Sequence, residues 1–386
     1  MILMKPGDVD YLRLALRLAR HGYGTTSPNP MVGAVLVKGG KVIGCGWHRR
    51  AGGPHAEIEA IRNAQQRGHS PKGGTIYVTL EPCSTHGRTP PCTEAIIRAG
   101  IKRVVAGALD PNPRHCGSGY AALKGAGISV THGVLGQECE RLNEAFNHWI
   151  VRRSPFVTVK AGMTLDGKIA TASGESRWVT GEVARSQGMK LRQGSDAILV
   201  GINTVLNDDP SLTYRGPGAG KRNRNQTARG HHLRRIVLDA RARTPLDAKV
   251  VSDENRGLTT LVTSKAASRS RVAALAKNVK VLIAPARKGR IDLRWLLKRL
   301  GAEEVTSLLV EGGGEVNASF LLQGLAQRVV FFYAPKILGG RDSRKAVAGA
   351  GARRLGDALA LNNVKWRKLG PDLMLTARVK ERQIGL

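Results

Sequence analysis

Four residues in the first third of the chain have the types and spacing of a catalytic zinc site. His55 is followed by Glu57, and Cys83 and Cys92 come later with eight residues between them. Zinc takes nitrogen and sulfur ligands in a tetrahedron, and catalytic sites leave the fourth position to water. His55, Cys83 and Cys92 are therefore the expected ligands. Zinc lowers the pKa of bound water, and Glu57, which is not needed as a ligand, is placed to carry the proton to a leaving amine.

The alternatives are a closed structural zinc site, with Cys45 or His48 as the fourth ligand, and cysteines that only pack. A carboxylate beside a three-ligand zinc is the deaminase arrangement, and this favours the catalytic interpretation. Each ligand cysteine is expected to adjoin a helix, whose N–H groups stabilise a thiolate. The three remaining cysteines are expected to be packed thiols; they are Cys45, Cys116 and Cys139.

The chain is strongly basic, with 61 Lys and Arg against 29 Asp and Glu and a formal charge of +32. Such a field attracts polyanions, so nucleic acid is one interpretation and phosphorylated small molecules are the other. Aromatic residues make up only 4% and offer few platforms for stacking bases. Five cysteines do not suggest a disulfide framework, and no segment predicts a signal peptide or membrane span, so we expect a cytoplasmic protein.

Two α/β domains are expected, 1–151 and 152–386, because a helical pattern ends at Arg152-Arg153-Ser154-Pro155. Asp8 or Asp10 is expected to cap the first helix. In the first domain we expect strands at 31–37, 42–45, 75–80 and 103–109 and helices at 56–66 and 137–151. In the second we expect strands at 156–161, 197–201, 235–239, 260–263, 279–283 and 307–310.

Two features of the second domain stand apart from this pattern. No Gly-x-Gly-x-x-Gly follows its first strand, but the strand at 307–310 runs into Glu311 and three glycines. Glycines before a helix allow close approach to a pyrophosphate, although an ordinary strand-to-helix turn is also compatible. The basic stretch 215–235 is expected to be an exposed, mobile loop.

The motifs in combination resemble one family. His55-Ala-Glu57 with Pro82-Cys-Ser-Thr-His-Gly-Arg-Thr-Pro-Pro-Cys92, and Ser27-Pro-Asn-Pro-Met-Val-Gly-Ala-Val35, resemble the bifunctional riboflavin-biosynthesis deaminase/reductase family. Nucleoside and tRNA deaminases usually separate the two cysteines by two residues. The segments 160–168, 174–178 and 201–215 resemble the reductase half of the family, so the resemblance covers essentially the whole chain.

The resemblance implies a cytidine-deaminase-like three-layer domain followed by a dihydrofolate-reductase-like α/β domain. It also implies zinc-dependent deamination of 2,5-diamino-6-(5-phosphoribosylamino)pyrimidin-4-one. NADPH-dependent reduction of 5-amino-6-(5-phosphoribosylamino)uracil to the ribityl compound would follow. The alternatives are a tRNA or nucleoside deaminase with an accessory domain, and a nucleic-acid-binding protein with an inactive deaminase fold. The expected partners are the phosphorylated pyrimidine and NADPH, without a membrane or a specific nucleic acid; a homo-oligomer stays open.

Site residues follow from the same resemblance. It implies NADPH contacts at Gly162, Trp178, Thr204, Asp208, Gly313, Gly314, Glu315, Val316, Asn317, Ala318 and Ser319. It implies contacts to the phosphorylated sugar at Ser176, Arg192, Leu212, Arg215 and Glu311. In the deaminase it implies that Asn29 holds the pyrimidine and that the loop around Arg88 faces the phosphate, with His48 and Asn112 as further pocket candidates. A packing role for Leu212 and a solvated loop charge at Arg88 are the alternatives.

Overall fold

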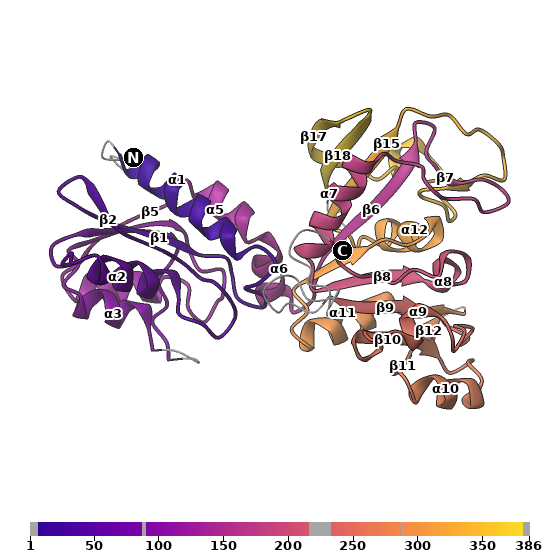
Figure 1. The fold of residues 1–386 in the computed structure, drawn as a ribbon, viewed down its shortest axis with the longest axis horizontal. Helices are drawn as coiled ribbons and strands as arrows, with labels where there is room; N and C mark the ends of the chain where they lie inside the picture. Colours follow the sequence, from indigo (N-terminus) through magenta and orange to yellow (C-terminus); the bar gives the residue numbers. More distant parts are fainter. Residues whose placement is uncertain (1–6, 87–89, 216–232, 288, 381–386) are drawn as a thin grey trace. The chain divides into compact units, whose positions relative to one another are not determined.

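The computed structural model describes residues 7–86, 90–215, 233–287 and 289–380. The chain divides into two compact units, Met1–Arg153 and Ser154–Leu386 (Figure 1). Arg88 and the basic residues 216–232 lie outside the described residues. No helix among the described residues is long and apolar enough to cross a membrane.

The first unit contains a five-stranded sheet in the order β2-β1-β3-β4-β5. The expected hairpin is confirmed: β1 and β2 pair antiparallel across Gly39 and Gly40, which both have positive φ. Strands β3, β4 and β5 run parallel, so their carboxyl ends share one edge of the sheet. The strands are β1 (Gly33–Lys38), β2 (Lys41–Trp47), β3 (Thr75–Leu80), β4 (Arg103–Ala108) and β5 (Ser129–His132).

Helices cover both faces of this sheet, which makes the expected three layers (Figure 1). Alternate residues of β1 point to opposite faces, as a strand requires. Ala34 and Leu36 join one buried cluster with α2 and α3, whereas Val35 and Val37 join another with α1 and α5. The helices are α1 (Asp8–Ala19), α2 (Ala56–Gln66), α3 (Cys92–Arg98), α4 (Ser118–Gly125), α5 (Gly136–Leu142) and α6 (Glu144–Arg152).

Two expectations for the first unit are wrong. The residue that caps α1 is Gly7, and Asp8 instead binds Arg103 through two contacts of 2.9 and 2.7 Å. The helix expected at 137–151 is two helices, α5 and α6, because the chain breaks at Asn143. The Asn143 side chain exchanges hydrogen bonds of 2.8 Å with the backbone N–H and C=O of Met31, which lies 112 residues away.

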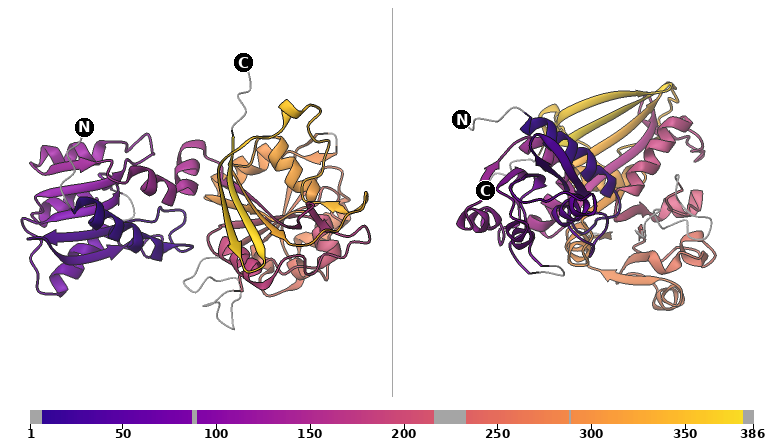
Figure 2. Two further views of the ribbon diagram at one scale, coloured as in Figure 1. Left: turned by 90° about the horizontal axis from the view of Figure 1, so that it is seen from above. Right: turned by 60° about the vertical axis from the view of Figure 1, so that its left-hand side comes forward.

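The second unit is built on a nine-stranded sheet in the order β11-β10-β9-β8-β14-β6-β15-β18-β17. The seven strands from β11 to β15 are parallel, and β18 and β17 add an antiparallel edge, the yellow strands in Figure 2. The strands are β6 (Phe156–Thr164), β8 (Ala197–Gly201), β9 (Arg234–Leu238), β10 (Thr259–Ser264), β11 (Lys280–Ala284), β14 (Ser307–Val310), β15 (Arg328–Ala334), β17 (Leu361–Leu369) and β18 (Asp372–Val379).

Helices also pack on both faces of this sheet. Residues of α11 and α12 join one buried cluster with β6 and β14, and residues of α8, α9 and α10 join another with β8 and β9. In sheets of this kind, ligands bind beyond the carboxyl ends of the strands. The main helices are α7 (Glu182–Gln193), α8 (Ile202–Asp208), α9 (Lys249–Ser252), α10 (Arg269–Ala276), α11 (Leu293–Ala302) and α12 (Gly314–Leu322).

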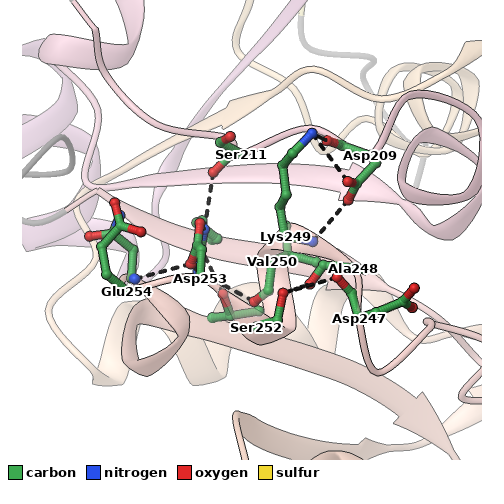
Figure 3. A network of polar contacts seen from close by, with 12 residues as sticks. Asp209, Ser211, Asp247, Ala248, Lys249, Val250, Ser252, Asp253 and Glu254 are labelled. Carbon is green, nitrogen blue, oxygen red and sulfur yellow. Dashed lines mark hydrogen bonds and ion pairs between the residues drawn. The ribbon is translucent and has the colours of Figure 1, made fainter.

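The last residue of the basic stretch 215–235, Arg235, is not in an exposed loop as expected, whereas the strand predicted from the same residue onward is confirmed as β9. Arg235 belongs to β9 and is fully buried, and its guanidinium forms two contacts of 2.7 Å with the Asp253 carboxylate. Arg235 also donates to the backbone C=O of Ser211 (3.1 Å). Lys249 forms an ion pair with Asp209 at 3.2 Å, and Figure 3 shows its side chain reaching Asp209. These interactions fix the chain between α8 and residue 215.

Candidate active sites

The three expected zinc ligands come together at the carboxyl edge of the first sheet. His55 is the N-cap residue of α2, Cys83 follows β3, and Cys92 is the first residue of α3. His55 Nδ1 lies 3.2 Å from Cys92 Sγ and 3.5 Å from Cys83 Sγ. Tetrahedral zinc with ordinary bond lengths would separate such N and S atoms by about 3.6 Å. The donor set and its spacing therefore fit a zinc ion.

The first residue of α3 stabilises the thiolate form of Cys83, the form that binds a cation. The backbone N–H of Cys92 donates to Cys83 Sγ (3.3 Å). The expectation that Cys83 adjoins a helix in sequence is wrong, because α3 begins only at Cys92. A hydrogen bond from the Cys92 thiol lowers the pKa of Cys83 to about 4, while the same contact and burial raise the pKa of Cys92. Binding of a divalent cation by both sulfurs would release the remaining thiol proton.

Glu57 lies in the first turn of α2, two residues after the His55 ligand, and is only 3% exposed. Burial raises the pKa of its carboxyl to about 7, although nearby His55 opposes this shift. The Glu57 carboxylate is also near enough to Cys92 to raise the pKa of that thiol. A buried carboxyl beside the ligands, able to hold or release a proton near neutral pH, suits general acid–base chemistry.

Asn29 and His48 extend this site from the loop before β1 and the end of β2. His48 Nδ1 lies 3.0 Å from the Pro54 carbonyl, and its Nε2 lies 3.2 Å from Asn29 Nδ2. The His48 and His55 rings are 5.3 Å apart in an edge contact. Both ring nitrogens of His48 are thus engaged, which argues against a closed site with His48 as fourth ligand.

Among the described residues, the ligand cluster contains only His55, Cys83 and Cys92. Cys139 is buried in the core as expected, Cys45 is half-buried, and Cys116 is exposed, so a packed role is wrong for Cys116. Asn112 lies in the loop after β4, where its side chain accepts from the Arg114 N–H (3.2 Å).

The second unit brings Arg192 and Glu311 together at the carboxyl edge of its sheet. Arg192, from α7, donates to both Glu311 oxygens at 3.0 and 2.9 Å and to the Thr213 carbonyl at 2.9 Å. Lys160 Nζ lies 3.7 Å from Glu311. Burial alone would raise the pKa of Glu311, but Arg192 and Lys160 lower it to about 2. Lys160 was not predicted as a site residue, although it is the first residue of the segment 160–168 that resembles the reductase half of the family.

Several other expected residues gather along the same edge. The Ser176 hydroxyl donates to Asp208 at the end of α8 (3.0 Å). Trp178 is 63% exposed, and the Arg185 guanidinium lies 4.6 Å from its ring centroid. Leu212 is buried in the core cluster beside β8, so its side chain has a packing role. Of the remaining expected residues, Gly162 lies in β6, Thr204 lies in α8, and Arg215 is exposed.

The glycine-rich turn after β14 brings only some of its expected cofactor residues to a pocket. A cavity of about 450 Å³ is lined by Glu315, Val316 and Ser319 of α12. Asn317 and Ala318 are instead buried within the unit, and Asn317 donates to the Ala346 carbonyl (2.8 Å). Gly313 is the N-cap of α12, whose first residue is Gly314.

Four further residues of this pocket were missed from the sequence. Arg241, Arg243 and Arg290 line it and carry three positive charges. Asp239, at the end of β9, is fully buried, and its Oδ1 has no hydrogen-bond partner among the described residues. The available signal was the pair of arginines directly after a predicted strand, because loops at that end of a parallel strand bind ligands.

Comparisons with known proteins match each unit to a family. The RibD C-terminal domain family matches residues 155–375, and the cytidine and deoxycytidylate deaminase zinc-binding region matches 6–108. Riboflavin biosynthesis protein RibD of Aquifex aeolicus is 44% identical over 95% of this chain and 97% of its own length. The Escherichia coli protein of the same name is 41% identical over 95% and 98%. The structure of Acinetobacter baumannii RibD superposes with a TM-score of 0.84 at 34% identity, covering 97% of this chain and 99% of that chain.

Fold, ligand cluster and family matches together define a zinc-binding deaminase unit followed by a reductase unit of the NADPH-dependent class. The three-layer and reductase folds expected from the sequence are confirmed. The chain belongs to the riboflavin biosynthesis protein RibD family.

Proposed function

We propose that the chain catalyses two consecutive steps of riboflavin biosynthesis, a hydrolytic deamination followed by a reduction. A relative from Thermotoga maritima, 33% identical over 97% of this chain and 99% of its own, is described as a diaminohydroxyphosphoribosylaminopyrimidine deaminase/5-amino-6-(5-phosphoribosylamino)uracil reductase. The observation that carries the proposal is the buried Glu57 beside a three-ligand cluster in a chain that also carries the reductase unit. A tRNA deaminase or an inactive nucleic-acid-binding fold is not favoured.

In the deaminase, His55, Cys83 and Cys92 would hold zinc, which supplies activation of the attacking water when it is bound. Glu57 accepts one proton from that water and delivers it to the ring nitrogen. It then accepts the second proton, from the hydroxyl formed at the ring carbon, and delivers it to the departing amino group. Asn29, kept in place by His48, donates to the pyrimidine. Water therefore enters at the ring carbon and ammonia leaves.

In the reductase, NADPH supplies the hydride when it is bound. Glu311 accepts hydrogen bonds from sugar hydroxyls, and the Arg215 guanidinium suits the phosphate. Three of the N–H donors of Arg192 are used by Glu311 and Thr213. We therefore propose that Arg192 holds Glu311 in position and offers only its remaining donors to the substrate.

The pocket between β9 and α12 accounts for the remainder of the cofactor. Three arginines suit the extra phosphate that distinguishes NADPH from NADH. We propose this pocket as the adenosine subsite, with Thr204, Asp208 and Trp178 nearer the reacting end.

We propose that the protein works in the cytoplasm and that its high positive charge attracts phosphorylated metabolites rather than a specific nucleic acid. Purified protein given the diaminopyrimidine phosphate should release ammonia without NADPH, and should oxidise NADPH only after that release. Ammonia release that requires NADPH, or no turnover of this substrate, would contradict the proposal.

Replacing Cys83 with serine should remove most of the bound zinc, because a serine hydroxyl is a poor substitute for a thiolate ligand. Metal analysis should give about one zinc per wild-type chain and much less in the variant. Cys139→Ser is the matched control, since Cys139 is buried in the same unit away from the ligand cluster. Undiminished zinc in Cys83→Ser would contradict the ligand assignment.

Replacing Arg241 with serine should weaken NADPH more than NADH, because only NADPH carries the additional phosphate. We expect the KM for NADPH to rise about tenfold, the equivalent of one charge-assisted contact, with little change for NADH. Arg256→Ser provides the control, since Arg256 is exposed and does not line the pocket. Equal losses with both cofactors would place the phosphate elsewhere.

A further inference from the structure

Glu81 is a buried acid that the proposed reaction does not use. It lies two residues before Cys83 and is 5% exposed. Its Oε1 accepts from the N–H groups of Gly119 (2.8 Å) and Tyr120 (3.4 Å), and its Oε2 accepts from those of Asp110 (3.1 Å) and Gly117 (3.0 Å). No ion pair of Glu81 occurs in the described part of the chain. Four backbone donors therefore compensate its charge.

These four donors all belong to one segment, residues 109–120, which we call the β4 loop because it follows β4 and runs into α4. Strands β3 and β4 are parallel neighbours, so the loop begins beside the point where the chain leaves β3 for Cys83. One carboxylate thus ties both ends of the β4 loop, at Asp110 and at Gly119, to the segment that carries a ligand.

Further contacts join the same two segments. The hydroxyls of Ser84 and Ser118 are 2.8 Å apart, and Thr85 Oγ1 lies 3.4 Å from His115 Nδ1. A Cβ atom at Gly119 would collide with the Pro82 carbonyl oxygen, so the backbones are in direct contact there. The β4 loop therefore contacts residues 81–85 at several points. These residues carry the ligand Cys83, whereas the ligand Cys92 belongs to α3.

We infer that Glu81 is a positioning residue of the deaminase: its carboxylate holds the β4 loop against the Cys83 segment and so fixes one wall of the pyrimidine site. This inference rests on the proposed deaminase function. An isosteric amide cannot do the same, because its NH₂ group would face two N–H donors. A shift on the order of 1 Å in a positioning element can cost about 10²-fold in rate.

The test is Glu81→Gln in the full-length protein. We expect deaminase kcat/KM to fall by about 10²-fold, with zinc content and NADPH oxidation of already-deaminated substrate retained. Amide hydrogen exchange should accelerate at Gly117 and Gly119 and not in α2. Asp8→Asn is the matched control: Asp8 is a buried carboxylate of the same unit that binds Arg103, at the opposite end of β4. It should lower the melting temperature without changing turnover per bound zinc.

Gly119→Ala is a second variant, which separates the two segments while leaving Glu81 intact. It should reproduce the loss of deamination with zinc retained. The inference is overturned if wild type is active and Glu81→Gln deaminates at the wild-type rate. It is equally overturned if activity is lost only in proportion to zinc or to folded protein, as in a purely structural role. A wild-type protein that does not deaminate would instead contradict the proposed function.

Discussion

The Glu57→Ala variant should lose deaminase activity by about 10²–10⁴-fold, the usual contribution of a general acid–base. Zinc should stay bound, because the carboxylate is not among the ligands. NADPH oxidation should be unchanged when already-deaminated substrate is supplied, because the reductase residues belong to the other unit. Ammonia release and NADPH absorbance measure the two activities separately.

Glu59→Ala is the matched control for this variant. Glu59 lies about half a turn further along α2 and forms an ion pair with Arg49 at the protein surface (3.1 Å). Its loss should leave deamination close to wild type. Loss of both activities in a folded, zinc-loaded Glu57→Ala protein would mean that the two sites are not independent.

The second large effect is expected in Glu311→Gln, which should lower reduction by at least about 10²-fold and spare ammonia release. The amide keeps the shape but removes the charge that Arg192 and Lys160 surround. Breaking a buried ion pair also lowers the free energy of unfolding, by roughly 3–5 kcal/mol. The melting temperature of the variant must therefore be measured together with its reaction rates. Glu303→Gln is the control, because Glu303 precedes β14 whereas Glu311 follows it, at opposite ends of one strand.

The same pair makes a prediction about pH. The folded pKa of Glu311, about 2, lies below the ordinary value of about 4.3. Its contribution to stability is therefore fully present above the ordinary value and is lost as the pH falls toward the folded pKa. Between these limits the melting temperature of wild type should fall more steeply with decreasing pH than that of Glu311→Gln. Parallel curves would contradict the buried charge.

Much of this architecture could be predicted from the sequence because its signals are local. The apolar runs of β3 and β8 and the spacing of His55, Cys83 and Cys92 are each contained in short segments. The break at Asn143 could not be predicted, because its cause is a partner 112 residues away. Arg235 was expected both at the end of the basic stretch and at the start of a strand, and β9 confirms the strand. Its burial could not be predicted, because the Asp253 carboxylate that compensates its charge lies 18 residues away.

The reductase pocket shows the same limit. Its α12 residues lie in one predicted segment, whereas Arg241 and Arg290 come from separate segments that the fold brings together. Within α12 the helical turn decides which residues face the pocket. Val316 and Ser319, three positions apart, line it, while Asn317 between them is buried on another side.

The strand order of the second sheet has a consequence for how the chain acquires its two activities. Register pairs Phe156 at the start of β6 with Ser307 at the start of β14, about 150 residues later. The first unit closes its hairpin between β1 and β2 within 15 residues of chain, from Gly33 to Trp47. Parallel pairing of strands that are far apart in sequence forms slowly, because the entropy cost of closing the loop comes before the stabilising contacts form. During synthesis the deaminase unit should therefore complete its sheet before the central strand β14 of the reductase has been made. A truncated or stalled chain should then have deaminase activity and no reductase activity.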